Sequence, residues 1–126
     1  MWAFGMAKIV KKLWGIERWL HNENDYCMKI LELNPGFQSS LHYHKHKRET
    51  FLVTQGNVHL EVISGYRVGQ ERKKLVVLGP GRFYTLDPYV PHRFTAIGDR
   101  AMIVEASTRH DDRDVFRLEE SRKLGS

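Results

Sequence analysis

The chain has 126 residues, of which 41% are hydrophobic and 11% aromatic; this composition fits one globular domain and excludes an intrinsically disordered chain. Its net charge is +5, but the basic residues are scattered and no basic run with interleaved aromatics is present, so we expect no nucleic-acid binding. No run approaches the ~18 apolar residues of a membrane span, and the single Cys27 excludes an internal disulfide and indicates a reducing compartment, which we take to be the cytoplasm.

The N-terminal part is the least regular. Residues 1–11 begin with apolar residues and then turn basic, which is the wrong order for a secretory signal, so we interpret them as an extension ahead of the domain. Residues 11–24 place Trp14, Ile16, Trp19 and Leu20 around Gly15. This pattern fits one face of a short helix or an irregular strand, and the glycine argues against a long helix.

The rest of the chain is a series of short strands, each closed by a turn signal. A mixed period-2 alternation predicts a strand over residues 26–34, followed by a Pro-Gly turn. Further strands are predicted over 39–44, 49–55, 58–64, 75–78, 82–86, 92–97 and 101–107. Many short strands with Gly and Pro turns are typical of an all-β barrel or jelly roll. The tail, 114–124, fits a strand turn followed by a short helix.

Three histidines and a glutamate fall within eight residues: His42, His44, His46 and Glu49. Residues i and i+2 of a strand point the same way, so His42 and His44 present two imidazoles on one face. A hairpin over 45–48 would let Glu49 begin the next strand facing the same centre. We expect His46 to be exposed in the charged loop. The alternative interpretation is that His42 and His44 are solvated in a polar loop.

A fourth ligand must come from elsewhere, and His92 is the best candidate. It follows Pro91 at the start of a predicted strand whose same-face residues, Phe94 and Ala96, are apolar. Imidazole nitrogens and carboxylate oxygens are donors that first-row divalent metals prefer. Three imidazoles and one carboxylate are compatible with Zn, Mn, Fe or Ni, so we predict one divalent transition metal of undetermined identity.

The spacing G-x5-H-x-H-x4-E-x6-G, which runs from Gly36 to Gly56, resembles the first signature of the cupin family. DPYVPH (87–92) resembles the second signature, P-x-G-x-x-H-x3-N. In that segment Pro88 is displaced by one position, Tyr89 replaces the glycine and Ala96 replaces the asparagine. The resemblance covers about residues 12–108.

The cupin resemblance implies a double-stranded β-helix, the jelly-roll barrel, with an N-terminal arm and a short C-terminal extension. We place the N-terminal extension at 1–11, the barrel domain at 12–113 and the C-terminal tail at 114–126. Carried over by position, the resemblance implies that the metal ligands are His42, His44, Glu49 and His92.

Two further segments resemble the cupin domains of mannose-6-phosphate isomerase type II. KLWGIERWLHN (12–22) is similar to their KPWG-x-E opening, with Leu13 in place of proline, and AMIVEASTRHDDRDVFRLEES (101–121) is similar to their ending. The resemblance implies a sugar or sugar-phosphate isomerase that works through a metal-stabilised enediolate, with Glu49 moving a proton between C1 and C2. The same ligand set fits an iron dioxygenase of the cupin class, and a non-catalytic sugar- or metal-binding module is a third reading.

The expected partner is a small molecule, a sugar or an anionic sugar derivative. Candidate substrate-binding residues are Lys47, Arg48, His59, Tyr84 and Phe94, and we expect Arg93 to point outward because it alternates with His92. We also expect a homodimer, because the aromatic residues Trp2, Phe4, Trp14 and Trp19 offer apolar area to a partner. Burial of these aromatics over the barrel's own end is the competing interpretation.

Overall fold

The computed structural model describes residues 5–125. The predicted Trp2 and Phe4 contacts therefore lie outside the described residues. The described elements are β1 (Lys8–Lys12), β2 (Gly15–Asn22), β3 (Cys27–Leu33), β4 (Phe37–Gln38), β5 (Leu41–Tyr43), β6 (Glu49–Gln55), β7 (Val58–Ser64), the 3-10 turn η1 (Tyr66–Val68), β8 (Arg72–Leu78), β9 (Phe83–Leu86), β10 (His92–Ala96), β11 (Ala101–Ser107), the 3-10 turn η2 (Asp112–Asp114), β12 (Phe116–Glu119) and β13 (Arg122–Lys123).

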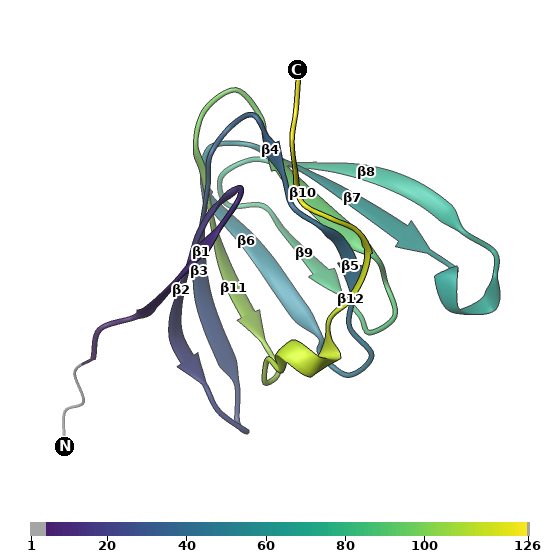
Figure 1. Ribbon diagram of the computed structural model, residues 1–126, viewed down its shortest axis with the longest axis horizontal. Helices are drawn as coiled ribbons and strands as arrows, with labels where there is room; N and C mark the ends of the chain where they lie inside the picture. The colour runs from purple at the N-terminus through teal and green to yellow at the C-terminus, as the bar shows by residue number, and fades with distance from the viewer. Residues whose placement is uncertain (1–4, 126) are drawn as a thin grey trace.

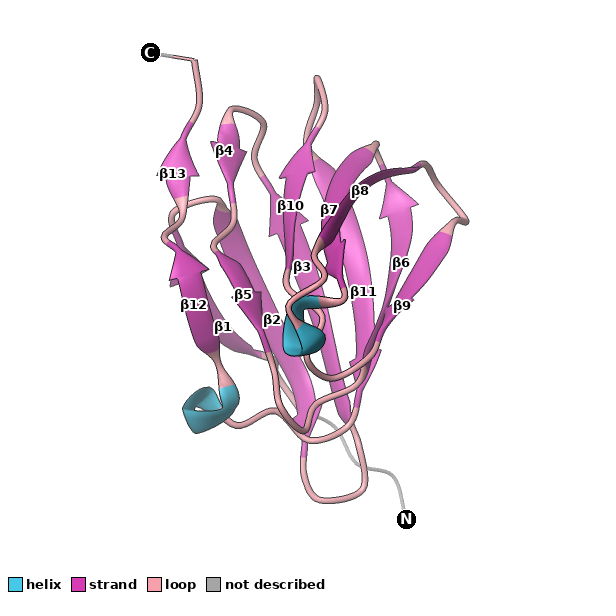
Figure 2. Cartoon of the chain, turned by 90° about the vertical axis from the view of Figure 1, so that its right-hand side faces the viewer, coloured by secondary structure: helices cyan, strands magenta, loops and turns pink. Residues whose placement is uncertain are grey.

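The strands form two antiparallel sheets that enclose one core, as Figures 1 and 2 show. One sheet has the order β1-β2-β3-β11-β6-β9. The other has the order β12-β5-β10-β4-β13, and β7 joins it through β10 and carries β8 on its other side. Neighbouring strands are often distant in sequence, as in β3 with β11 and β5 with β10. The predicted all-β jelly-roll barrel is confirmed.

Alternating side chains of the central strands build the core. In β3 every second residue is buried, from Cys27 to Leu33, while the residues between them are half-buried or exposed. β6 and β11 repeat this pattern with Phe51, Val53 and Ile103 pointing inward. The two inner faces together bury a large apolar area, so the hydrophobic effect stabilises the packing of the sheets. The candidate site lies at one end of this core.

The aromatic residues Trp14 and Trp19 lie against the core. Residues 15–22 form strand β2, so the strand interpretation of this segment is correct and the helix is not. A side chain at Gly15 would collide with the carbonyl oxygen of Glu32 on β3, which explains the glycine. Trp14 is buried and packs edge-on against Phe94 with ring centroids 4.9 Å apart. Trp14 and the half-buried Trp19 therefore cover the barrel's own interior, as the competing interpretation holds, and the homodimer stays a prediction.

The first and last described strands pair with the sheets. β1 overlaps the segment 1–11 that we interpret as an extension, and it pairs with β2 from Lys8 to Lys12. In the tail, β12 pairs with β5 and β13 pairs with β4, where we had expected a strand turn and a short helix. Pairing with a distant strand outweighs the local preference of this charged segment. Across residues 5–125, no helix has the length and hydropathy that crossing a bilayer requires.

Candidate metal centre

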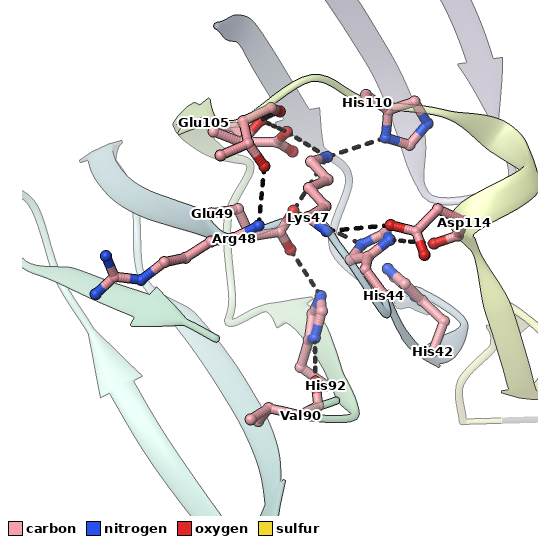
Figure 3. A network of polar contacts seen from close by, with 12 residues as sticks. His42, His44, Lys47, Arg48, Glu49, Val90, His92, Glu105, His110 and Asp114 are labelled. Carbon is pink, nitrogen blue, oxygen red and sulfur yellow. Dashed lines mark hydrogen bonds and ion pairs between the residues drawn. The ribbon is translucent and has the colours of Figure 1, made fainter. Parts of the chain in front are cut away.

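Three imidazoles converge at one end of the core. His42 lies on β5, His44 follows it directly, and His92 begins β10, where it pairs in register with His42. One ring nitrogen from each histidine lies within 4.8 Å of the other two. These are the predicted histidines, and Figure 3 shows them facing a common space. Imidazole nitrogens at this spacing are able to share one divalent ion.

A carbonyl oxygen orients each of the three rings. His42 Nδ1 lies 3.1 Å from the Ser40 carbonyl oxygen, His44 Nδ1 lies 2.8 Å from the Asp114 carbonyl oxygen, and His92 Nδ1 lies 2.9 Å from the Val90 carbonyl oxygen. His42 Nδ1 also lies 3.0 Å from the Ser40 hydroxyl, which can accept a hydrogen bond as well. A carbonyl oxygen only accepts hydrogen bonds, so donation from each Nδ1 to its carbonyl leaves each Nε2 lone pair for a metal.

Glu49 stands beside this group and close to two of its members. Its Oε1 lies 2.9 Å from His92 Nε2, and its Oε2 lies 3.7 Å from His44 Nε2. Although Oε1 and His92 Nε2 are close, they are not aligned for a hydrogen bond, and both atoms are buried without a hydrogen-bond partner. Buried polar atoms normally have partners. A cation placed between these two atoms would satisfy both, so the residues present fit a metal ion.

The electrostatics keep these side chains in the forms that bind a cation. Burial lowers the pKa of His42 well below its ordinary value, and burial also lowers the pKa of His44, so both rings are neutral at pH 7. Burial alone would raise the pKa of Glu49. The nearby Lys47 ammonium outweighs burial and holds that pKa well below its usual range. Neutral imidazoles and an ionised carboxylate are the ligand forms that metals require.

Lys47 is the centre of a buried ionic network next to the histidines (Figure 3). Its Nζ lies 2.7 Å from Glu105, 3.1 Å from Glu49 and 3.0 Å from His110 Nδ1. An ammonium has three N–H donors, so all of them are engaged. Burial would lower the pKa of Lys47, but Glu105 and Glu49 raise it, and the lysine stays charged.

His110 completes the network as a neutral ring. Burial, with help from the nearby Lys47 charge, lowers the pKa of His110 to about 4. Its Nδ1 accepts from Lys47, and its Nε2 lies 2.8 Å from Asp112 Oδ1, to which it donates. The tautomer is therefore set by the two neighbours.

A cavity of about 480 Å³ extends from the histidines across the barrel. His110 bridges its two ends, with ring centroids 6.1 Å from His44 and 5.2 Å from Trp19. At the far end Lys29 Nζ lies 4.0 Å from the centre of the Trp19 ring and 3.5 Å from Glu17 Oε1. Trp19 Nε1 donates to the same Glu17 oxygen at 2.8 Å. An aromatic ring and paired charges thus face the histidines across the cavity.

Two of the five predicted substrate-binding residues line this cavity, and the other three do not. Lys47 and Phe94 line it. Arg48 lies outside it, with its side chain 64% exposed and 2.7 Å from Asp87. His59 is on the outer side of β7, since its neighbours Val58 and Leu60 point inward, and Tyr84 packs against the core without reaching the cavity wall. Strand parity and the hairpin turn direct Arg48, His59 and Tyr84 away from this cavity, and a role for them in substrate binding stays a prediction.

Two further predictions concern residues near the ligands. His46 is exposed, as expected. Arg93 points away from the cavity, also as expected, but it is buried on the outer side of β10, where its Nη1 lies 3.3 Å from Glu119.

Sequence reasoning missed several residues of the cavity wall. Lys29 and Glu105 occupy inward positions of β3 and β11, in rows that are otherwise apolar, and a charged residue in such a row is the signal that could have revealed them. His110, Asp112 and Asp114 come from the irregular segment after β11, and no periodic pattern marks them.

Comparison with known proteins finds both related sequences and similar structures. The family model described as "Cupin domain" matches residues 29–107. The "D-lyxose ketol-isomerase" of Thermofilum sp. (strain ex4484_79) is 30% identical over 133 residues, which cover 90% of this chain and 73% of that protein.

Two solved structures are similar in fold. Oxalate decarboxylase from Bacillus subtilis superposes with a TM-score of 0.77 and 17% identity over 94% of this chain. The capsular polysaccharide assembling protein CapF from Staphylococcus aureus superposes with a TM-score of 0.79 and 14% identity over 93% of this chain. The chain spans 33% and 32% of the length of these two structures, about a third in each case.

Proposed function

The chain belongs to the cupin family, and from this premise we propose that it is a metal-dependent ketol-isomerase of an unphosphorylated sugar. The observation that carries the proposal is the convergence of three imidazoles beside a cavity whose wall includes His42, His44 and the carboxylates of Glu49 and Glu105. The similarity to a protein named as a ketol-isomerase supports the reaction class. The fold alone would not, because one fold hosts many activities.

We propose that His42, His44, His92 and Glu49 hold one divalent ion. The donor set is compatible with Zn, Mn, Fe or Ni. Bound there, the ion would act as a Lewis acid that polarises the carbonyl oxygen and the adjacent hydroxyl of the sugar.

Glu105 is our candidate for the base that moves the proton. The sequence pointed to Glu49, but the low pKa of Glu49 and its position against two imidazoles make it a better ligand than base. The Glu105 carboxylate would take the proton from C2 of an aldose and return it to C1. The Lys47 ammonium bridges the two carboxylates, 2.7 Å from Glu105 and 3.1 Å from Glu49.

The charges in the cavity favour a neutral sugar over a sugar phosphate. All three donors of Lys47 are engaged, and Arg48 lies outside and pairs with Asp87. Lys29 is held between Glu17 and the Trp19 ring. Among the described residues, the two buried lysines that line the cavity, Lys29 and Lys47, already have partners, so a phosphate dianion would find no free buried cation there. The carboxylates, by contrast, can accept hydrogen bonds from sugar hydroxyls.

The test is isomerisation in deuterated water. The protein is loaded with Mn²⁺ under anaerobic conditions and given aldopentoses, aldohexoses and their terminal phosphates, and deuterium at C1 and C2 is followed by NMR. We expect exchange with a neutral sugar, a loss of about 100-fold or more in rate for Glu105→Gln with unchanged metal content, and loss of metal for Glu49→Gln.

Three other results would contradict parts of the proposal. A preference for phosphorylated sugars that disappears in Lys12→Ala or Arg117→Ala, two cations that also line the cavity, would refute the neutral substrate. Oxygen consumption by the Fe²⁺-loaded protein without isomerisation would assign it to the dioxygenases. Stabilisation by sugar without turnover would make it a binding module.

A further inference from the structure

Asp114 connects the C-terminal segment to the candidate metal centre. Its carboxylate accepts hydrogen bonds from the backbone N–H groups of Lys45, His46 and Lys47, at 2.8, 3.1 and 3.1 Å. Its carbonyl oxygen accepts from His44 Nδ1 at 2.8 Å. One residue thus binds four consecutive residues of the loop between β5 and β6. Figure 3 shows Asp114 facing His44 and Lys47.

The segment that carries Asp114 is itself ordered. Asp111 caps η2 by accepting from the backbone N–H of Arg113 at 2.9 Å, and the Arg113 guanidinium bonds back to the Asp111 carboxylate at 2.9 and 3.1 Å. Immediately after Asp114 the chain enters β12, which pairs with β5. Asp114 is therefore fixed from both sides before it contacts the loop.

His44 differs from the other two histidines in how it is oriented. His42 and His92 each bond a carbonyl oxygen two residues upstream, so their own strands fix their rings. The carbonyl oxygen that faces His44 comes from a residue 70 positions away. Hydrogen bonds to the outer nitrogen of a ligating histidine set its tautomer and ring direction. For His44 alone, that control is supplied by a remote part of the chain.

We infer that Asp114 is a positioning residue of the site, which holds His44 in the Nδ1–H tautomer and sets the loop that carries Lys47. This inference rests on the proposed metal centre. Under this inference, metal affinity depends on the docking of residues 111–119 as well as on the four proposed ligands. By the same linkage, metal binding stabilises that segment against local opening.

The test compares Asp114→Asn with a matched control, Asp111→Asn, in the full-length chain. Asp114→Asn keeps the size of the side chain but removes its charge and one acceptor oxygen, so the three loop amides lose part of their partner. Asp111→Asn perturbs the same turn without a contact to the loop. Zn²⁺ and Co²⁺ affinities are measured by calorimetry, with the Co²⁺ absorption spectrum as a report on geometry, and unfolding temperatures are measured without metal.

We expect Asp114→Asn to bind metal at least 10-fold more weakly, in the range of about 10- to 100-fold found for such outer partners, and to change the Co²⁺ spectrum. Asp111→Asn should bind within about twofold of the wild type. If Asp114→Asn lowers the unfolding temperature but leaves affinity and spectrum unchanged, its role is merely structural and the inference is overturned.

A metal-free measurement separates this inference from the proposed function. In the apo protein, imidazole ¹⁵N resonances should show His44 as the Nδ1–H tautomer in the wild type and in Asp111→Asn, and as a mixture in Asp114→Asn. An unchanged tautomer in Asp114→Asn refutes the positioning role. Absence of metal binding by the wild type, with the tautomer shift still observed, refutes the metal centre but leaves the control of His44 by Asp114 standing.

Discussion

Replacing Lys47 with methionine should expose how much the buried ionic network depends on one cation. The side chain of Lys47 is 2% exposed, and those of its partners Glu49 and Glu105 are 2% and 5% exposed. Methionine fills a similar volume but removes all three donors. Two carboxylates and the His110 Nδ1 then lie in the interior with no cation between them.

The expected loss of unfolding free energy at pH 7 is about 3–5 kcal/mol, the usual cost of removing one partner of a buried ion pair. The loss should shrink as the pH falls. Without the ammonium, the two carboxylates raise each other's pKa in the folded state, and protonation of one of them relieves the repulsion. The double variant Lys47→Met/Glu105→Gln should recover part of the loss, because it also removes one of the uncompensated charges.

Urea unfolding at pH 7 and pH 5 measures these quantities, with Lys45→Met as the control. Lys45 is in the same loop but exposed, 4.4 Å from the Phe116 ring, so its loss should cost no more than about 1 kcal/mol. A loss below about 1 kcal/mol for Lys47→Met, or one that does not change between the two pH values, would show that Lys47 is not the counter-ion of these carboxylates.

Three further outcomes follow from local features. The pKa of His110 is about 4 in the folded protein against an ordinary 6.5. The neutral ring therefore contributes at most about 3 kcal/mol to the free energy of unfolding, fully present above pH 6.5 and lost as the pH falls toward 4. In urea unfolding, the stability of His110→Gln should change less with pH over that window. Tyr89 has φ +66°, so Tyr89→Ala should be less stable than Tyr89→Gly by about 1 kcal/mol in thermal or urea unfolding, and equal stability would contradict backbone strain. Gly36 and Gly56 of the first signature both have positive φ. A Cβ at Gly56 would lie 2.5 Å from the Arg100 carbonyl oxygen, whereas a Cβ at Gly36 would meet no atom within 4 Å. Calorimetry should therefore find Gly56→Ala clearly less stable than Gly36→Ala.

The strands were predictable wherever burial repeats with a period of two. The predicted ranges 49–55, 58–64 and 101–107 coincide with β6, β7 and β11, because apolar residues alternate there and Gly-containing turns bound each strand. The segments that open and close the chain have no such pattern. β2 and β12 are strands because they pair with β3 and β5, and such pairing is a property of the fold and not of the local sequence.

The histidine cluster was predictable for a similar reason. His42 and His44 share a face by strand parity, and the structure brings His92 into register with His42. The partners that tune the cluster were harder to predict. The register between Glu105 and Phe51 places that carboxylate beside Lys47, and strand register across a sheet is not visible in one sequence. Tyr89 takes the positive φ expected of the glycine in the second signature, and its N–H donates to the His44 carbonyl oxygen at 2.7 Å.

The contact between Asp114 and the His44 loop has a consequence for biosynthesis. The two residues are 70 positions apart, so at a synthesis rate of about 5–20 residues per second the loop exists for roughly 3 to 14 seconds before its partner is made. During that interval the amides of Lys45, His46 and Lys47 have only water to bond. We therefore expect His42 and His44 to become a competent pair only after translation has passed residue 114.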